Sequence, residues 1–261
     1  MASLRLFLVG GLTSYRALFR WLSPWILIPV FLVSPIFQIL LFAFVGRTAG
    51  VGDDAFFLIG NAVQYASIPC LFAMSNAISG ERNQATLPLL LVSPARRVPL
   101  FLGRSLPVIL NGFLVAVVAL AVGAVLLRVR FPVSSLPPLA LVVAVCAFAC
   151  TGLGLLVAAL ALRIREVAVL SNVFFGILLI FSGVNVPVSA LPGWMAAISA
   201  WLPLTHGIAA AREVAAGAAL GSVSPDLLTE AGIGALYVAV ALVLLAWLEQ
   251  ESRRRATLET Y

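Results

Sequence analysis

The sequence predicts an all-α membrane protein, and its composition, the placement of its charges and the length of its uncharged stretches all point that way. Hydrophobic residues make up 62% of the 261 residues and charged residues only 10%, and the mean hydropathy is +1.13. A soluble domain of this length needs a far more charged surface. The charges that are present gather between long uncharged stretches, so they are expected at the edges of a membrane.

Six stretches are predicted to be transmembrane helices, because each approaches or exceeds the roughly 20 residues that cross a bilayer. The fourth helix is expected to begin only near Pro138, because Pro132 and Pro137 flank two serines in a pattern typical of a loop. The predicted spans are about 22–45, 56–78, 106–127, 138–162, 167–186 and 231–248.

The distribution of arginine between the two sides of the membrane favours this topology. All 16 basic residues are Arg, so arginine alone can be counted. Six spans with both termini cytoplasmic place twelve Arg inside and four outside, whereas seven spans give ten and six. The positive-inside rule favours six. The apolar residues 187–222 are then expected to form re-entrant helices on the extracytoplasmic side, covered by protein rather than lipid. A plain surface loop is the alternative. The residues expected in this cap are Pro187, Pro192, Trp194, Trp201, Pro203 and His206.

Residues 3–21 mix leucine and phenylalanine with arginine, which is typical of a helix lying in the inner membrane interface. A cleaved signal peptide is the rival interpretation. It needs small residues at the cleavage site, where this chain has Tyr15, Arg16, Phe19 and Arg20.

The net charge of +6 and a pI near 10 do not indicate nucleic-acid binding, because the arginines are divided among several segments between spans. Topology and anionic lipids explain them. Cys70, Cys146 and Cys150 fall inside predicted spans and are expected to pack as small apolar residues. No metal site and no cofactor in this chain are predicted.

Three functional classes are disfavoured by residues that are missing. We expect no ionisable residue in the core of a span, which argues against a secondary carrier driven by protons or sodium. A single histidine without G-x-S-x-G argues against an intramembrane hydrolase. Without lysine the chain has no P-loop, so it is not expected to be an enzyme, and ATP and Mg would bind a partner subunit. A passive channel or scaffold subunit and a secondary carrier remain the alternatives.

Residues 81–99 are a charged, leucine-rich island between uncharged stretches and are expected to form a cytoplasmic loop. Leu87, Leu90 and Leu91 share a helix face, and exposed leucines favour a partner groove. The alternative is that the arginines only enforce topology. The residues expected to couple to an ATPase are Glu81, Arg82, Thr86, Leu87, Leu90, Leu91, Pro94, Arg96 and Arg97.

Two blocks of the sequence resemble the ABC-2 type permeases, the membrane subunits of ATP-binding-cassette exporters. The block ERNQATLPLLLVSPARRVPLFLGR is similar to the family's E-R-x-x-G-T-L-E-x-L-x-x-S-P followed by G-[KR], with Ala85 and Pro88 departing from it. The block SGVNVPVSALPGWMAAISAWLPLTHGIAAAR is similar to S-G-x-x-x-P…L-P…P-L-T-[YH]…R. Its matching residues are Ser182, Gly183, Pro187, Leu191, Pro192, Pro203, Leu204, Thr205 and Arg212.

The resemblance implies a permease subunit of an ATP-driven exporter in the bacterial cytoplasmic membrane. It also implies a second permease copy, most simply as a homodimer, and one nucleotide-binding subunit docked on the 81–99 coupling loop of each copy. The apolar spans suit an amphiphilic drug, lipid or lipid-linked substrate. Polar residues that could line its path are Asn61, Gln64, Ser67, Ser171 and Asn172. Hydrogen bonding between helices is an equally good account of these side chains.

Overall fold

The computed structural model describes residues 29, 33–50, 52–83, 97–160, 163–164 and 166–255. In these ranges every regular element is a helix, which confirms the predicted all-α class for the described part of the chain. The α-helices are α3 (Ser34–Ala49), α4 (Asp54–Tyr65), α5 (Ser67–Asn83), α7 (Arg97–Leu127), α8 (Leu136–Leu160), α9 (Val167–Phe181), α10 (Gly193–Ser199), α11 (Thr205–Ala215) and α12 (Ser224–Arg255). Two short 3-10 turns, η2 (Val133–Ser135) and η3 (Val188–Ala190), precede α8 and α10.

Four helical segments are long and apolar enough to cross a membrane: Asp54–Asn76, Gly103–Leu127, Val133–Leu160 and Ser224–Leu248. They overlap the second, third, fourth and sixth predicted spans. The apolar helices α3 and α9, of 16 and 15 residues, are shorter than a full span. The predicted interfacial helix 3–21 and most of 22–32 lie outside the described residues. The chain is therefore a multi-pass membrane protein, and the count of six spans stays a prediction.

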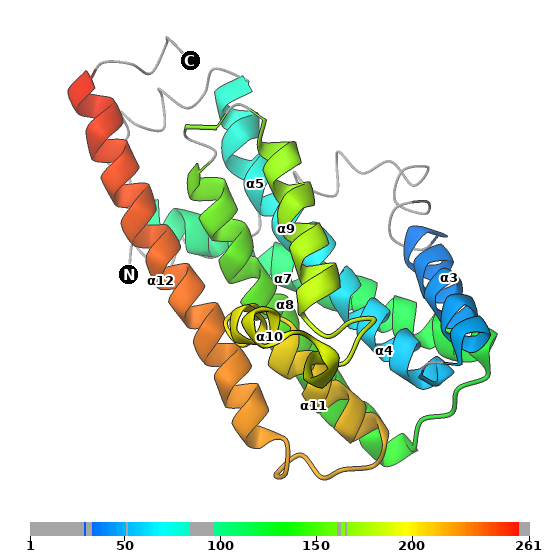
Figure 1. Cartoon of the computed structure of the whole chain (residues 1–261). Coiled ribbons are helices and arrows are strands. Elements are labelled where there is room, and N and C mark those ends of the chain that lie inside the picture. The colour runs from blue at the N-terminus through cyan, green and yellow to red at the C-terminus, as the bar shows by residue number, and fades with distance from the viewer. Residues whose placement is uncertain are drawn as a thin grey trace.

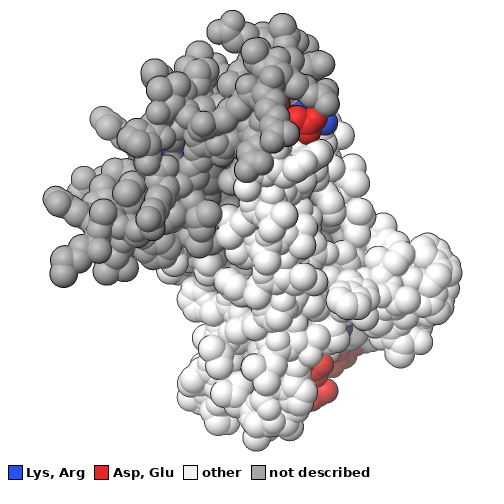
Figure 2. All heavy atoms as spheres, turned by 90° about the vertical axis from the view of Figure 1, so that its left-hand side faces the viewer, with Lys and Arg blue, Asp and Glu red and all other residues white. Residues whose placement is uncertain are grey.

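The surface fits a lipid environment. Figure 2 shows one face, on which the charged atoms of described residues lie near the two ends and the wide band between them carries none. Large apolar side chains point outward along the helices, with Phe37 70%, Val125 78% and Val243 70% exposed. In water such a surface would drive aggregation, whereas in a bilayer it contacts acyl chains.

Helix α8 lies at the centre and packs mainly against α5 and α12 (Figure 1). Small residues make these contacts close: a Cβ on Gly154 would lie 2.0 Å from the carbonyl oxygen of Cys70 in α5. A Cβ on Gly152 would lie 2.5 Å from the carbonyl oxygen of Gly234 in α12. Glycine at a helix crossing lets two backbones approach, as membrane helices often require.

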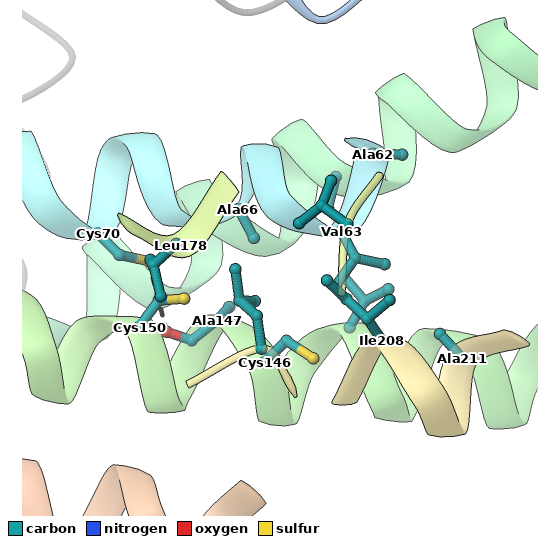
Figure 3. Packing of buried hydrophobic residues seen from close by; sticks show 14 of the residues in the cluster. Ala62, Val63, Ala66, Cys70, Cys146, Ala147, Cys150, Leu178, Ile208 and Ala211 are labelled. Carbon is teal, nitrogen blue, oxygen red and sulfur yellow. Dashed lines mark hydrogen bonds between the residues drawn. The ribbon is translucent and has the colours of Figure 1, made fainter. Parts of the chain in front are cut away.

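Figure 3 shows the core beside this crossing, where labelled side chains of α8 face those of α4, α5 and α11. Cys146, Cys150 and Cys70 are all 0% exposed there. The Cys70 thiol donates to the carbonyl oxygen of Ala147 at 3.4 Å and accepts from the Thr151 hydroxyl at 3.2 Å. The predicted packing role of the three cysteines agrees with these positions.

A short connection joins α3 to α4 at one end of the bundle. The Asp53 carboxylate caps α4 by accepting from the backbone nitrogen of Phe56 at 2.8 Å, the favoured chemistry at a helix start. Arg47 Nε, in the last turn of α3, donates to Asp54 Oδ1 at 2.7 Å. Cap and ion pair fix the angle at which the two helices leave this end.

Candidate functional site

The predicted coupling loop lies between α5 and α7. Glu81 and Arg82 are in the last turn of α5 and Arg97 is the first residue of α7. The segment 84–96 lies outside the described residues, and with it Thr86, Leu87, Leu90, Leu91, Pro94 and Arg96. Their coupling role stays a prediction.

Two of the predicted path residues, Asn61 and Gln64, are brought together by a third residue that sequence reasoning missed. Gln38 of α3 donates from Nε2 to Asn61 Oδ1 and to Gln64 Oε1, both at 2.8 Å. Asn61 Nδ2 donates to the carbonyl oxygen of Phe57 at 2.9 Å and to Oδ1 of Asn185, before η3, at 2.8 Å. We call Gln38, Asn61, Gln64 and Asn185 the amide cluster.

The amide cluster joins three separate parts of the chain. Asn61 and Gln64 are both 0% exposed, whereas Gln38 and Asn185 are half-buried at its edge. The amide nitrogen Nε2 of Gln64 is buried and has no hydrogen-bond partner. An unpaired buried donor is uncommon because desolvating it costs about 1–3 kcal/mol.

The other predicted path residues do not join this cluster. The Ser67 hydroxyl donates to the carbonyl oxygen of Gln64 at 2.6 Å, a local bond between α4 and α5. Ser171 of α9 donates to the Ser75 hydroxyl at 3.1 Å. Ser75 is 14 residues after Asn61, about 21 Å along α4 and α5. Asn172 is exposed and donates to the carbonyl oxygen of Ala168 in its own helix at 2.8 Å.

The segment expected to form re-entrant helices contains two short helices, α10 and α11. Pro187 and Pro192 sit at the caps of η3 and α10. Trp194 and Trp201 are 64% and 68% exposed. The Trp194 ring packs edge-on against the ring of Phe181 in α9, with 6.1 Å between the ring centroids. Aromatic side chains in this position suit a membrane interface. The depth of these helices in the membrane stays a prediction.

The α10–α11 corner is fastened to its neighbours by polar contacts. Pro203 is buried, and its carbonyl oxygen accepts from the Ser182 hydroxyl at 3.1 Å. His206 places Nδ1 3.3 Å from Asp226 Oδ1 and Nε2 3.3 Å from the carbonyl oxygen of Ala200. These contacts connect the corner to α9, α10 and α12.

Glu230 of α12 is the ionisable residue that sequence reasoning missed. The sequence predicts no ionisable residue in the core of a span and a last span that begins at 231, whereas Glu230 lies within the candidate span Ser224–Leu248 and is 0% exposed. Its Oε1 accepts from the backbone nitrogen of Leu204 at 2.6 Å and its Oε2 from that of Gly207 at 3.0 Å. Leu204, at φ 78°, precedes α11 without a side-chain cap of its own. The carboxylate thus caps α11 from another helix, where the helix dipole favours a negative charge.

Arg212, in the last turn of α11, holds three segments together. Its Nη1 donates to the carbonyl oxygen of Gly183 at 2.8 Å, and its Nη2 donates to that of Val184 at 2.8 Å and of Phe56 at 3.2 Å. The guanidinium lies 3.5 Å from the centre of the Phe56 ring, a cation–π contact. Burial lowers the pKa of Arg212 to about 10, so the side chain stays charged at neutral pH. The guanidinium fits here because residue 60 is glycine: a Cβ on Gly60 would lie 2.7 Å from Arg212 Nη2.

Among the described residues, no group of three or more His, Cys, Asp or Glu side chains is arranged to hold a metal ion. The polar features of this half of the bundle are therefore the amide cluster, the Arg212 clamp and the Glu230 cap. The amide cluster and the Arg212 clamp link the connection after α9 to α4, and the Glu230 cap links the start of α11 to α12.

Comparison with known proteins agrees with this architecture. The family model described as ABC-2 type transporter matches residues 11–215. Two curated relatives, each named "Probable multidrug ABC transporter permease YbhR", come from Escherichia coli strain K12 and Escherichia coli O157:H7. Each is 25% identical over 155 residues, which is 59% of this chain and 42% of the relative. The match therefore spans less than half the length of these relatives. Because the family model covers most of the chain, the protein belongs to the ABC-2 type transporter family.

Proposed function

We propose that this chain is the permease subunit of an ATP-driven exporter that moves an amphiphilic drug, lipid or lipid-linked molecule across the bacterial cytoplasmic membrane. The family match over residues 11–215 carries the proposal. The Escherichia coli relatives are named as probable multidrug permeases, which supports an amphiphilic cargo.

A nucleotide-binding subunit supplies the energy in this proposal. It binds ATP and Mg and docks on the coupling loop 81–99, which connects α5 to α7. Two permease copies, each with its ATPase subunit, form the transporter. Closure of the ATPase dimer moves the coupling loops and opens a path for the substrate.

Six spans with both termini in the cytoplasm complete the proposal. Here α3 is the outer part of the first span, α9 is the fifth span, and α10 and α11 re-enter from the outer side. An ion pair supports this arrangement: Arg163 Nη2, after α8, lies 2.8 Å from Glu251 Oε2 near the end of α12. Six spans place both residues on the cytoplasmic side, whereas seven spans place them on opposite sides.

Cysteine labelling tests the topology. After Cys70, Cys146 and Cys150 are replaced, single cysteines at Ser189, Ser222 and Thr257 are treated with a membrane-impermeant thiol reagent on spheroplasts. We expect the first two positions to react from outside and Thr257→Cys only after permeabilisation. Reaction of Thr257→Cys from outside, with Ser222→Cys protected, would establish seven spans instead.

Reconstitution tests the function. We expect the purified chain to hydrolyse no ATP, and the complex with its ATPase subunit to show vanadate-sensitive hydrolysis that drives efflux of a fluorescent amphiphile from vesicles. Efflux without the ATPase subunit, or hydrolysis by the chain alone, would overturn the proposal. A passive channel would release the probe without ATP.

A proton-driven carrier is the second candidate, and Glu230 is the observation that favours it. A buried carboxylate within a span is the usual coupling group of such carriers. Here, however, both carboxylate oxygens already accept backbone hydrogen bonds, which favours a structural role. Dissipating the proton gradient with an ionophore distinguishes the two, because ATP-driven efflux should persist and proton-driven transport should stop.

A further inference from the structure

The amide cluster has a hydrogen-bonding capacity that its internal contacts leave unused. A carboxamide nitrogen has two hydrogens to donate. Gln38 Nε2 uses its two on Asn61 and Gln64, and Asn61 Nδ2 uses its two on Phe57 and Asn185. Gln64 Nε2 has no partner although Gln64 is 0% exposed. Hydrogen bonding between helices uses only the Oε1 atom of Gln64. It does not account for a buried Nε2 donor at this position.

From this we infer that the amide cluster is a binding site for the uncharged, oxygen-rich headgroup of an amphiphile, such as a sugar or a hydroxyl-bearing ester; the inference rests on the proposed transport function. A hydroxyl or carbonyl oxygen of the headgroup accepts from Gln64 Nε2. At the half-buried edge, Gln38 Nε2 exchanges one of its amide acceptors for another headgroup oxygen, and Asn185 Oδ1 accepts from a headgroup hydroxyl in place of Asn61.

The charges around the cluster favour a neutral headgroup over a cationic one. Its side chains bond to one another and to the backbone carbonyl of Phe57, so each of these partners is an amide or a backbone carbonyl. Arg212 is close to the cluster, because its Nη2 donates at 2.8 Å to the carbonyl oxygen of Val184, next to Asn185, and Asp53 offsets only part of its charge. A cationic group held here would be desolvated beside another cation, which is unfavourable. The two terminal nitrogens of Arg212 already donate to three carbonyl oxygens, so they are not free to bind an anion in the usual forked geometry.

The position of the cluster suits an amphiphile on its way out. Asn61 and Gln64 lie about 10 and 15 Å along the helix from Asp54, so with Asp54 at the outer edge, as the proposed six-span topology has it, they lie between that edge and the middle of a hydrocarbon core roughly 30 Å thick. On α3, Phe37 and Leu41 flank Gln38 along the helix and are 70% and 59% exposed. An alkyl chain can lie along these side chains while its headgroup occupies the cluster.

Photolabelling tests the inference on the complex of this chain with its ATPase subunit in lipid nanodiscs. The probes are dodecyl glucoside and dodecyltrimethylammonium, each carrying the same diazirine on the alkyl chain. We expect saturable labelling by the glucoside, weakened about tenfold or more in Gln64→Met, which removes the unpaired donor. Asn76→Leu, which changes an exposed carboxamide on α5, is the matched control and should bind as wild type does.

A second variant covers the case in which Gln64→Met does not fold. Gln38→Met changes a half-buried residue at the edge of the cluster and should weaken glucoside labelling in the same direction. Unchanged glucoside affinity in a folded Gln64→Met or Gln38→Met protein would overturn the inference. So would equal sensitivity of the trimethylammonium probe to these changes, or stronger labelling by dodecyl sulfate carrying the same diazirine.

The vanadate-sensitive ATPase activity of the complex, measured without probe, separates this inference from the proposed function. Loss of glucoside labelling in a Gln64→Met complex that elutes as wild type does, with labelling and basal hydrolysis both retained in Asn76→Leu, supports the site. A wild-type complex that forms no ATPase unit would refute the proposed function, while glucoside labelling of the isolated chain would still report on the amide cluster.

Discussion

Replacing Glu230 with alanine is expected to detach the start of α11 from α12. The carboxylate accepts from two buried backbone nitrogens, those of Leu204 and Gly207. A hydrogen bond to a charged group contributes about 1.5–3 kcal/mol, so the pair contributes about 3–6 kcal/mol. Glu230→Gln keeps one acceptor oxygen and turns an amide nitrogen toward a second donor, so we expect it to lose about half of that.

Thermal unfolding of the purified protein in detergent measures this loss. A loss of 3 kcal/mol or more corresponds to a fall in apparent Tm of about 6 °C or more for a chain of this size. Glu213→Ala, an exposed carboxylate on α11, is the matched control and should melt within about 1 °C of wild type, as most surface substitutions do. If Glu230→Ala and Glu213→Ala melt alike, the carboxylate does not cap α11 and the reasoning from its two hydrogen bonds is wrong.

Three further predictions concern other parts of the bundle. Gly154→Ala should abolish recovery of monodisperse protein in size-exclusion chromatography, because its Cβ would lie 2.0 Å from a backbone oxygen of α5; Gly176→Ala, with open space around it, should elute normally. Arg212→Lys should lower the apparent Tm by several degrees, because an ammonium cannot reproduce the forked donation to three carbonyls, whereas the exposed Arg130→Lys should not. Leu90→Asp should leave membrane insertion intact but uncouple ATP hydrolysis from efflux; wild-type efflux in this variant would remove the loop from the mechanism.

The length of the uncharged stretches predicts the four long helices correctly, because a stretch of apolar residues in a bilayer has to satisfy its backbone hydrogen bonds internally. It was a poorer guide to where helices begin. The prediction started the last span at 231, after the charge of Glu230, whereas α12 begins at Ser224. In the sequence, a carboxylate such as that of Glu230 indicates a membrane edge. In the structure, the start of α11 stabilises this carboxylate inside the protein.

The amide cluster shows the same limit at the candidate site. Asn61 and Gln64 could be selected from sequence because they share one face of a single helix. Gln38 and Asn185 come from other parts of the chain, and their meeting depends on how α3 and the connection after α9 pack on α4. Conversely, Ser171 and Asn172 are adjacent in sequence, but one is buried and the other exposed. Sequence spacing indicates a shared face, and tertiary packing decides which faces meet.

The glycine crossings of α8 restrict how this protein can change shape. Alternating access requires some helices to slide or tilt past others, and sliding requires slack between side chains. At Gly152 and Gly154 the nearest facing atom is a backbone carbonyl oxygen, which cannot move aside by changing a rotamer. We therefore expect α5, α8 and α12 to move as one rigid body and the relative motion to fall at its border, where α3 packs against α4 and the short helices α10 and α11 adjoin α9 and α12. The amide cluster lies on that border, so a bound headgroup would bias which of the two arrangements the transporter adopts.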